Sequence, residues 1–370
     1  INKYRLPFIY CLCQDSSSIE IYTAPTFAAG TILLVTSRIN RVFDRNEETG
    51  LYSPKKRGSL AVRFSVNKAR MLFLTTRPWS FSMTAISVLL GSVLAVSLGL
   101  LSWPSWNWLY ALLTLAGMIL VHGATNAIND YFDVKHKVDT PETATAQYRE
   151  HFIITGKLKP QEVLGFSILL YSIAAVIGVV LAVFRGWPIV LFAVIGGLTS
   201  FFYTGGPVKF KHLALGEAAV FLMWGPLMVL ASFFIQTGSF DRAGAVLLIS
   251  IPQGLWVLLV LFANNMKDTK HDSETGVKTV ANLLSLRASF VLFIVILFFI
   301  YGITVVEIIA GLLPITAVAV LVSFPLVLPL VRSLTREKQV PPDADPRTAR
   351  VGMIFGIVLL LSLIVSTVFL

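Results

Sequence analysis

Two short segments of the chain carry Asn and Asp side chains at matching spacings. The first lies within 126–139 and the second within 264–272, and each contains an Asn followed four residues later by an Asp. Residues three, four and seven apart share one face of an α-helix, so each segment would present a single stripe of side-chain oxygen atoms. A lone acid at a helix end commonly only contacts solvent, but two stripes of the same pattern indicate a binding site.

We expect a cation between these acids, because close carboxylates repel each other and the cost rises near a membrane. Oxygen ligands without His or Cys suit Mg²⁺, which keeps part of its water shell and is commonly held by carboxylates together with phosphate oxygens of a substrate. The pattern therefore predicts a diphosphate bound through Mg²⁺. The predicted metal ligands are Asn126, Asp130, Asp133, Asp139, Asp268 and Asp272.

Nearby cations and amides could bind the diphosphate directly. A loop rich in Gly and Pro at 203–211 ends in two lysines, and its glycine amides could also donate to phosphate oxygens. The alternative for these lysines is that they are ordinary basic residues of a cytoplasmic loop. The predicted diphosphate ligands are Asn126, Asn129, Lys209, Lys211 and Lys267.

Helices that cross a membrane must position these residues. The chain is 55% hydrophobic and only 14% charged, with a mean hydropathy of +0.76, which excludes an ordinary soluble domain. We predict an all-α integral membrane protein of about nine helices, arranged as two four-helix halves and a ninth helix, with the acidic segments closing the second helix of each half. The predicted spans are 79–101, 107–129, 163–184, 187–203, 218–236, 243–263, 288–304, 308–331 and 351–370.

Basic residues set the predicted orientation. Lys and Arg gather in loops on one side of the nine spans, and Arg185 and Arg242 are the two in the loops on the other side. By the positive-inside rule, the N-terminus and both acidic segments face the cytoplasm, with the protein in the cell (inner) membrane. This placement explains the net charge of +10 without a nucleic-acid partner. We interpret 1–72 as a cytoplasmic segment, disordered or an extension, and 73–370 as the transmembrane domain.

Two further polar residues lie in or near the apolar spans. His122 is one turn before Asn126, and we interpret it as a hydrogen-bonded structural histidine. Glu307 falls between the seventh and eighth predicted spans, where we interpret it as a solvated loop acid on the outer side. Arg77 opens the first span and could face the acidic segments.

The two motifs, at 129–133 and 268–272 on nine spans, resemble those of the UbiA superfamily of intramembrane aromatic prenyltransferases over 73–370. The segments at 77–78, 129–139, 203–207, 215–217 and 276–279 are most similar to the 1,4-dihydroxy-2-naphthoate polyprenyltransferases of menaquinone synthesis. Two departures stand out: Lys137 occupies a position where many members have a third Asp, which leaves Asp139 as the candidate, and the lysines after Tyr203 lie at a longer spacing than usual.

The resemblance implies Mg²⁺-dependent transfer of a polyprenyl group from a polyprenyl diphosphate, in the lipid bilayer, to a ring carbon of an aromatic acceptor. Metal ions and lysines would stabilise the leaving diphosphate, and an aromatic face such as that of Tyr203 would stabilise the allylic cation. The implied catalytic residues are Asp130, Asp133, Asp268, Asp272 and Tyr203.

Two alternatives stay open. The first keeps the enzyme class and changes the acceptor to 4-hydroxybenzoate, a chlorophyllide, haem or a glyceryl phosphate, because the motifs bind only the shared diphosphate. The second is a cation transporter that uses the acids as an ion pathway. The acids lie at span ends on one side of the membrane, which argues against a transporter.

Overall fold

The computed structural model describes residues 58–141 and 150–369, together with four short strands before them, and divides into two units, Ile1–Leu60 and Ala61–Leu370. In the first unit two antiparallel pairs form. They are β1 (Tyr10–Cys11) with β2 (Ile21–Tyr22), and β3 (Phe43–Arg45) with β4 (Tyr52–Pro54). The interpretation of 1–72 falls mostly outside the described residues, since only its last part belongs to a long helix, α1 (Gly58–Thr75).

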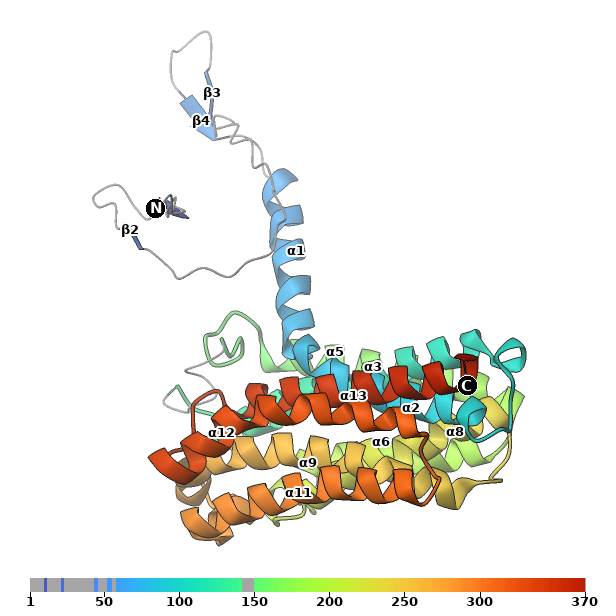
Figure 1. The fold of residues 1–370 in the computed structure, drawn as a ribbon. Coiled ribbons are helices and arrows are strands. Elements are labelled where there is room, and N and C mark those ends of the chain that lie inside the picture. Colours follow the sequence, from blue (N-terminus) through green and yellow to red (C-terminus); the bar gives the residue numbers. More distant parts are fainter. Residues whose placement is uncertain are drawn as a thin grey trace, which may run out of the picture. The chain divides into compact units, whose positions relative to one another are not determined.

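The second unit is a bundle of long helices (Figure 1). In the described part of the chain, eight helical stretches are long and apolar enough to cross a membrane, and a shorter apolar helix, α6, supplies the ninth. The stretches are η1–α2 (Pro78–Ser97), α3 (Trp108–Lys135), α5 (Pro160–Arg185), α6 (Pro188–Thr204), α7–η4–α8 (Gly216–Thr237), α9 (Ala243–Glu274), α11 (Leu286–Ile309), η5–α12–η6 (Ile315–Glu337) and α13 (Ala344–Phe369). The predicted all-α membrane fold of about nine helices is confirmed.

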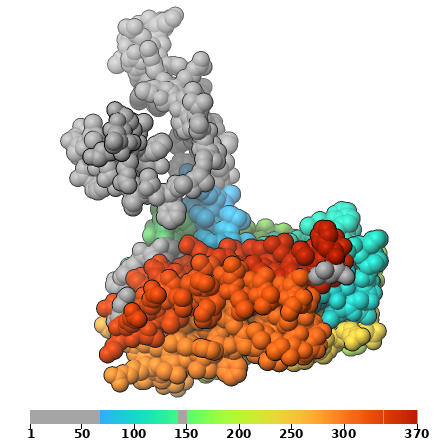
Figure 2. All heavy atoms as spheres, viewed as in Figure 1, coloured from blue at the N-terminus to red at the C-terminus, as the bar shows by residue number. Residues whose placement is uncertain are grey.

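The outer surface of this bundle is apolar. Figure 2 shows the C-terminal helices, orange to red, covering one face of the molecule. Many large apolar side chains are exposed on this surface, including Val183, Phe298 and Ile309. Such a surface would be unfavourable in water but suits hydrocarbon, where the helices satisfy their own backbone hydrogen bonds. The protein is therefore a multi-pass membrane protein.

Helices α3 and α9 extend beyond the apolar runs that predicted them. The run at 107–129 becomes a helix that ends at Lys135, and the run at 243–263 becomes one that ends at Glu274. Asn107 begins α3 by accepting hydrogen bonds from two amides of the first turn. Gly276, at φ +74°, follows α9 in the left-handed conformation that ends a helix. Both acidic segments therefore begin inside rigid helices rather than in loops.

A close helix contact shapes one wall of the interior. A Cβ atom at Gly225 would lie 2.9 Å from the Cα atom of Gly254, and one at Gly254 would lie 2.8 Å from the backbone oxygen of Phe221. Only glycine fits at both positions, and small residues of this kind let membrane helices approach closely. The contact presses the π-helical turn η4 (Met223–Leu227) against α9. Turns of this type often occur at functional sites.

The interpretation of Glu307 as a solvated loop acid is wrong. Helix α11 continues to Ile309, and the chain then reverses through Gly311 at φ +70°. The Glu307 side chain is 3% exposed, and both of its carboxylate oxygens lack a hydrogen-bond partner among the described residues. The eighth span consequently begins at Ile315 instead of 308, because hydropathy alone does not register the turn formed at Gly311 and Pro314.

Candidate active site

The ends of α3 and α9 face one cavity of about 1010 Å³. From the first segment the lining residues are Asn126, Asn129, Asp133 and Asp139, and from the second they are Asn264, Asn265, Lys267, Asp268, His271 and Asp272. The two segments also touch, since the Nε2 atom of His271 lies 2.9 Å from the backbone oxygen of Val138. The structure thus brings together the two stripes that sequence spacing predicted separately.

Asp133 is held by two hydrogen bonds. Its Oδ2 atom accepts hydrogen bonds from Asn129 Nδ2 at 2.9 Å and from Lys211 Nζ at 2.7 Å. Asn129 Oδ1 is buried at the cavity with no partner among the described residues. Asn126 Nδ2 donates to the backbone oxygen of Thr76 at 2.9 Å, which fixes the amide at the cavity wall.

Asp130 is placed differently from its neighbours. Its Oδ1 atom accepts a hydrogen bond from Arg77 Nη2 at 2.6 Å, and Asp130 is not among the described residues that line the cavity. Arg77 itself lines the cavity and has a left-handed backbone, with φ 54°, in the link between α1 and η1. Arg77, which the sequence marked only as a residue that could face the site, therefore forms an ion pair with this predicted ligand.

A buried histidine, His151, joins the first acidic group from the loop before α5. Its Nε2 atom lies 3.4 Å from Asp139 Oδ2 and 4.0 Å from Asp130 Oδ1. Burial tends to raise the pKa of Asp139, but the nearby His151 imidazole and the Lys211 charge outweigh it and hold the pKa below its ordinary value. Sequence reasoning missed His151 because its position bears no spacing relation to either motif.

The second segment is less fully paired. Asp268 Oδ2 accepts a hydrogen bond from Asn264 Nδ2 at 3.2 Å, whereas its Oδ1 atom is buried with no partner among the described residues. Lys267, predicted to contact the diphosphate, donates to Asp345 Oδ1 of α13 at 2.8 Å. Asp345 also lines the cavity and was missed, since the sequence of α13 gives no sign that its first turn reaches α9.

The loop at 203–211 supplies Tyr203 and one of its two lysines. Lys211 and Tyr203 line the cavity, and Lys209 is not among the described residues that do. Burial alone would lower the pKa of Lys211, but Asp133 and Asp139 raise it above its ordinary value, so the ammonium stays charged. The Gly205 amide is already bonded to the backbone oxygen of Phe201 and so does not serve as a phosphate donor.

Glu217 organises another part of the cavity wall. Its Oε1 atom accepts hydrogen bonds from Asn265 Nδ2 at 2.9 Å and from the Val280 amide at 3.2 Å. These bonds join α7 to α9 and to α10 (Val280–Leu283). Glu217 lies in the segment 215–217, which resembles the family, but only the structure shows that Glu217 fixes the orientation of Asn265.

The donor set of the cavity fits Mg²⁺. Asn129 Oδ1 and Asp268 Oδ1 are buried oxygens without a partner among the described residues, so a cation would satisfy them. In the part of the chain that the structure describes, no group of three or more His, Cys, Asp and Glu side chains is placed to hold a metal ion by itself. Separated oxygen ligands suit an ion that keeps water and completes its shell with phosphate oxygens.

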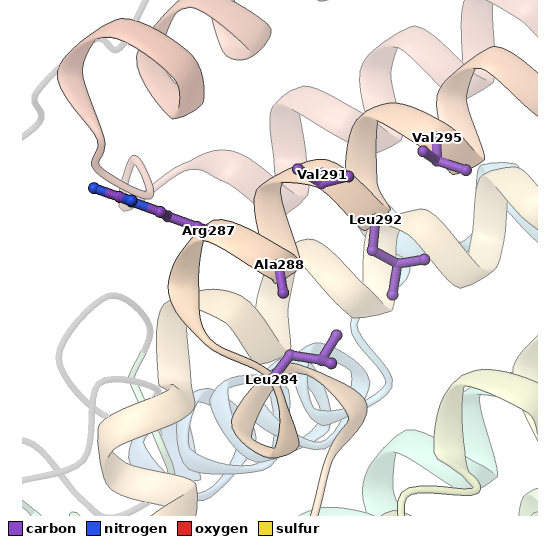
Figure 3. A pocket seen from close by; sticks show the side chains of 6 residues that line it. All are labelled: Leu284, Arg287, Ala288, Val291, Leu292 and Val295. Carbon is purple, nitrogen blue, oxygen red and sulfur yellow. The ribbon is translucent and has the colours of Figure 1, made fainter.

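A second hollow lies on the outer face of α11 and carries no comparable chemistry. It is lined by Leu284, Arg287, Ala288, Val291, Leu292 and Val295 (Figure 3). Arg287 is its one ionisable residue, and Figure 3 shows its side chain extending away from the aliphatic ones. The cavity between α3 and α9 is therefore the candidate active site.

Comparisons with known proteins identify the family. The sequence profile of the UbiA prenyltransferase family matches residues 84–355. UbiA prenyltransferase domain-containing protein 1 of Mus musculus is 32% identical over 307 residues, which cover 81% of this chain and 85% of that protein. The 1,4-dihydroxy-2-naphthoate octaprenyltransferase of Bacillus subtilis is 31% identical over 215 residues, covering 58% of this chain and 66% of that enzyme.

Solved structures share the fold. A UbiA homologue from Aeropyrum pernix superposes with a TM-score of 0.58 at 14% identity, over 77% of this chain and 97% of that one. A digeranylgeranylglyceryl phosphate synthase superposes with a TM-score of 0.55 at 17% identity, over 82% of this chain and all of the other. These identities establish the common architecture and leave the substrates to be argued from the site.

Proposed function

Since this chain belongs to the UbiA prenyltransferase family, we propose that it transfers a polyprenyl group from a polyprenyl diphosphate to an aromatic acceptor of the 1,4-dihydroxy-2-naphthoate class. The chain is a membrane prenyltransferase, and the choice of acceptor is our inference. One observation carries the proposal: Asp133 of α3, Asp139 just after that helix, Asp268 and Asp272 of α9, and the charged Lys211 line a single cavity.

The polar end of the cavity suits the departure of a diphosphate. We assign the predicted metal ligands Asn126, Asp133, Asp139, Asp268 and Asp272 to hold Mg²⁺, together with Asn129, which the sequence predicted as a diphosphate ligand. The remaining predicted metal ligand, Asp130, lies against Arg77. Mg²⁺, when bound, would neutralise the charge that develops on the phosphate oxygens. Lys211 would add a fixed positive charge at the same end, where such charge stabilises the transition state most strongly.

The remaining cavity suits the prenyl group and the ring. Its deeper lining is largely apolar and includes Met83, Met118, Val257 and Leu261, so little water would reach the allylic cation. Tyr203 also lines the cavity and can offer its ring face to the cation. The cavity end rich in acids lies on the side to which the basic loops belong, which supports a site facing the cytoplasm.

The acceptor class rests on two supports. The segments at 129–139, 203–207 and 276–279 resemble the dihydroxynaphthoate enzymes, and the Bacillus subtilis relative carries that activity in its name. A hydroxylated aromatic ring is rich enough in electrons to attack an allylic cation. The ring carbon that forms the new bond then loses a proton or, where it carries a carboxylate, carbon dioxide, and the bonding electron pair returns to the ring.

Turnover with defined substrates tests the proposal. Purified protein in lipid nanodiscs, given Mg²⁺, a polyprenyl diphosphate and 1,4-dihydroxy-2-naphthoate, is expected to release diphosphate and form a prenylated product, and EDTA is expected to stop both. 4-Hydroxybenzoate and glyceryl phosphate serve as competing acceptors. Turnover only with one of these would reject the acceptor, and cation flux into liposomes without any prenyl turnover would reject the enzyme in favour of a transporter.

The role of Tyr203 gives a graded prediction. We expect Tyr203→Phe, which keeps the ring, to lose only part of the rate, and Tyr203→Leu to lose about 2 kcal/mol of cation stabilisation, or roughly thirtyfold in kcat. Tyr131 of α3, which is not among the described lining residues, provides the matched control Tyr131→Leu with a near-normal rate. Equal rates for the wild type and Tyr203→Leu would assign Tyr203 to packing.

A further inference from the structure

The apolar part of the cavity contains a polar group that the proposed chemistry has not used. His122 and Ser80 both line the cavity, and Thr84 lies directly behind them. On α3, His122 precedes Asn126 by four residues, so it lies roughly 6 Å deeper along the helix axis and on the same face. It is therefore about one turn from the predicted diphosphate end, where the reacting ring must lie.

The hydrogen bonds around His122 determine which nitrogen carries its proton. Trp224 Nε1 donates to Thr84 Oγ1 at 3.0 Å, so the Thr84 hydroxyl has its own proton free to donate to His122 Nδ1 at 2.8 Å. Ser80 Oγ donates to the backbone oxygen of Arg77 at 2.7 Å, so towards His122 Nε2, 3.2 Å away, it can only accept. Both partners are satisfied when Nδ1 accepts and Nε2 carries the proton.

The ring of His122 is also held in place by aromatic neighbours. Phe81 contacts it edge-on at a centroid distance of 5.5 Å, and Trp224 does so at 5.0 Å. Trp224 belongs to the π-helical turn η4 that the contact of Gly225 with Gly254 presses towards α9. His122 therefore presents an N–H donor of fixed orientation on a wall that also carries a cavity-lining indole.

Two other polar side chains in this part of the cavity are less suited to bind a ligand. Thr125 and Ser200 line the cavity, but their hydroxyls are bonded to each other and to Tyr171, and Thr125 Oγ1 also donates to the backbone oxygen of Val121. Their hydrogen-bonding capacity is largely used within this cluster. The hydrogen bond between His122 and Ser80 is longer than the one between Thr125 and Ser200, and both His122 and Ser80 face the cavity.

We propose that His122 is an acceptor-binding residue, whose Nε2–H donates to a hydroxyl oxygen of the aromatic acceptor while the ring lies against Trp224. The inference rests on the proposed function and names the wall of the site that selects a hydroxylated ring. The acceptor oxygen replaces Ser80 Oγ as the partner of Nε2–H, and Ser80 keeps its bond to Arg77. Diphosphate binding does not involve His122.

Substitutions that remove or keep the donor test this assignment. His122→Leu is expected to raise the KM for the dihydroxy acceptor roughly tenfold, the usual effect of losing one buried hydrogen bond, and to leave the KM for the prenyl diphosphate unchanged. His122→Gln keeps an N–H donor near the Nε2 position and is expected to recover most of the affinity. His136→Leu is the matched control, because His136 is exposed after the end of α3 and is not among the described lining residues.

Acceptor analogues separate a hydrogen bond from a structural effect. One of the two monohydroxy analogues lacks the hydroxyl that His122 would contact. The wild type is expected to bind the dihydroxy acceptor roughly tenfold more tightly than this analogue, whereas His122→Leu is expected to bind the acceptor and this analogue equally. Each constant is measured as competitive inhibition, and size-exclusion chromatography with binding of a non-hydrolysable prenyl thiolodiphosphate verifies that the variants are folded.

The outcomes distinguish this inference from the function on which it rests. Any of three results would overturn the role of His122 and leave the prenyltransferase intact. They are an unchanged acceptor KM in His122→Leu, undiminished discrimination between the analogues in that variant, and equal losses for His122→Leu and His122→Gln. A folded wild type that prenylates no aromatic acceptor would overturn the proposed function and this inference together.

Discussion

Replacing Asp268 with alanine is expected to abolish turnover without unfolding the protein. Asp268 lies in α9, and one of its carboxylate oxygens is buried at the cavity with no partner among the described residues. If Asp268 holds Mg²⁺ against the diphosphate, its loss should lower kcat by roughly a hundred- to a thousandfold, as when other preorganised charge-stabilising groups are removed. The measurement is diphosphate release at saturating Mg²⁺ and both substrates.

Thermal stability provides the second readout for Asp268. An uncompensated buried carboxylate destabilises a folded protein, so Asp268→Asn should melt no lower than the wild type in EDTA while losing turnover. Mg²⁺ with a prenyl thiolodiphosphate should raise the melting temperature of the wild type more than that of Asp268→Asn. The control is Glu274→Ala, an exposed acid six residues further along α9. Near-normal turnover of Asp268→Ala, or equal losses in the Glu274 control, would remove Asp268 from the site.

The membrane helices could be predicted because lipid leaves few alternatives. A segment in hydrocarbon must satisfy its own backbone groups, so each long apolar run predicts a helix. The same signal fails where a polar residue is buried by protein. Glu307 seemed to end a span, yet α11 continues past it, and hydropathy could not distinguish an acid enclosed by neighbouring helices from one in water. Likewise, the turn at 310–314 is apolar, so hydropathy did not reveal it, although Gly311 and Pro314 are turn signals in the sequence.

The site was predictable where it depends on local spacing. Asn129 and Asp133 lie one turn apart on α3 and bond to each other, as the helical period requires. Its partners across the bundle were not predictable, because they come from elements whose packing no single motif encodes. Arg77 reaches Asp130 from the link before α2, and Asp345 reaches Lys267 from the first turn of α13. The choice between Lys209 and Lys211 also required the fold of the loop.

That choice leads to the second strong prediction: Lys211→Met is expected to lose most of its turnover and Lys209→Met almost none. Lys211 Nζ lies 2.7 Å from Asp133 Oδ2 at the cavity, and the neighbouring acids keep it charged by raising its pKa. A fixed cation there would stabilise the departing diphosphate, so kcat should fall by roughly a hundredfold. Lys209 is not among the described residues that line the cavity. Rates for both variants are measured side by side with saturating acceptor.

Stability must be separated from chemistry, because Lys211→Met leaves the Asp133 carboxylate buried without its strongest partner. Breaking a buried ion pair in this way costs about 3 kcal/mol or more, so a loss of turnover alone would be ambiguous. The double variant Asp133→Asn/Lys211→Met removes both charges and should regain the melting temperature of the wild type while staying inactive. Lys211→Arg keeps the charge and should retain more activity than Lys211→Met. If the double variant regains turnover along with stability, Lys211 only neutralises Asp133, and the leaving group must be stabilised by other residues.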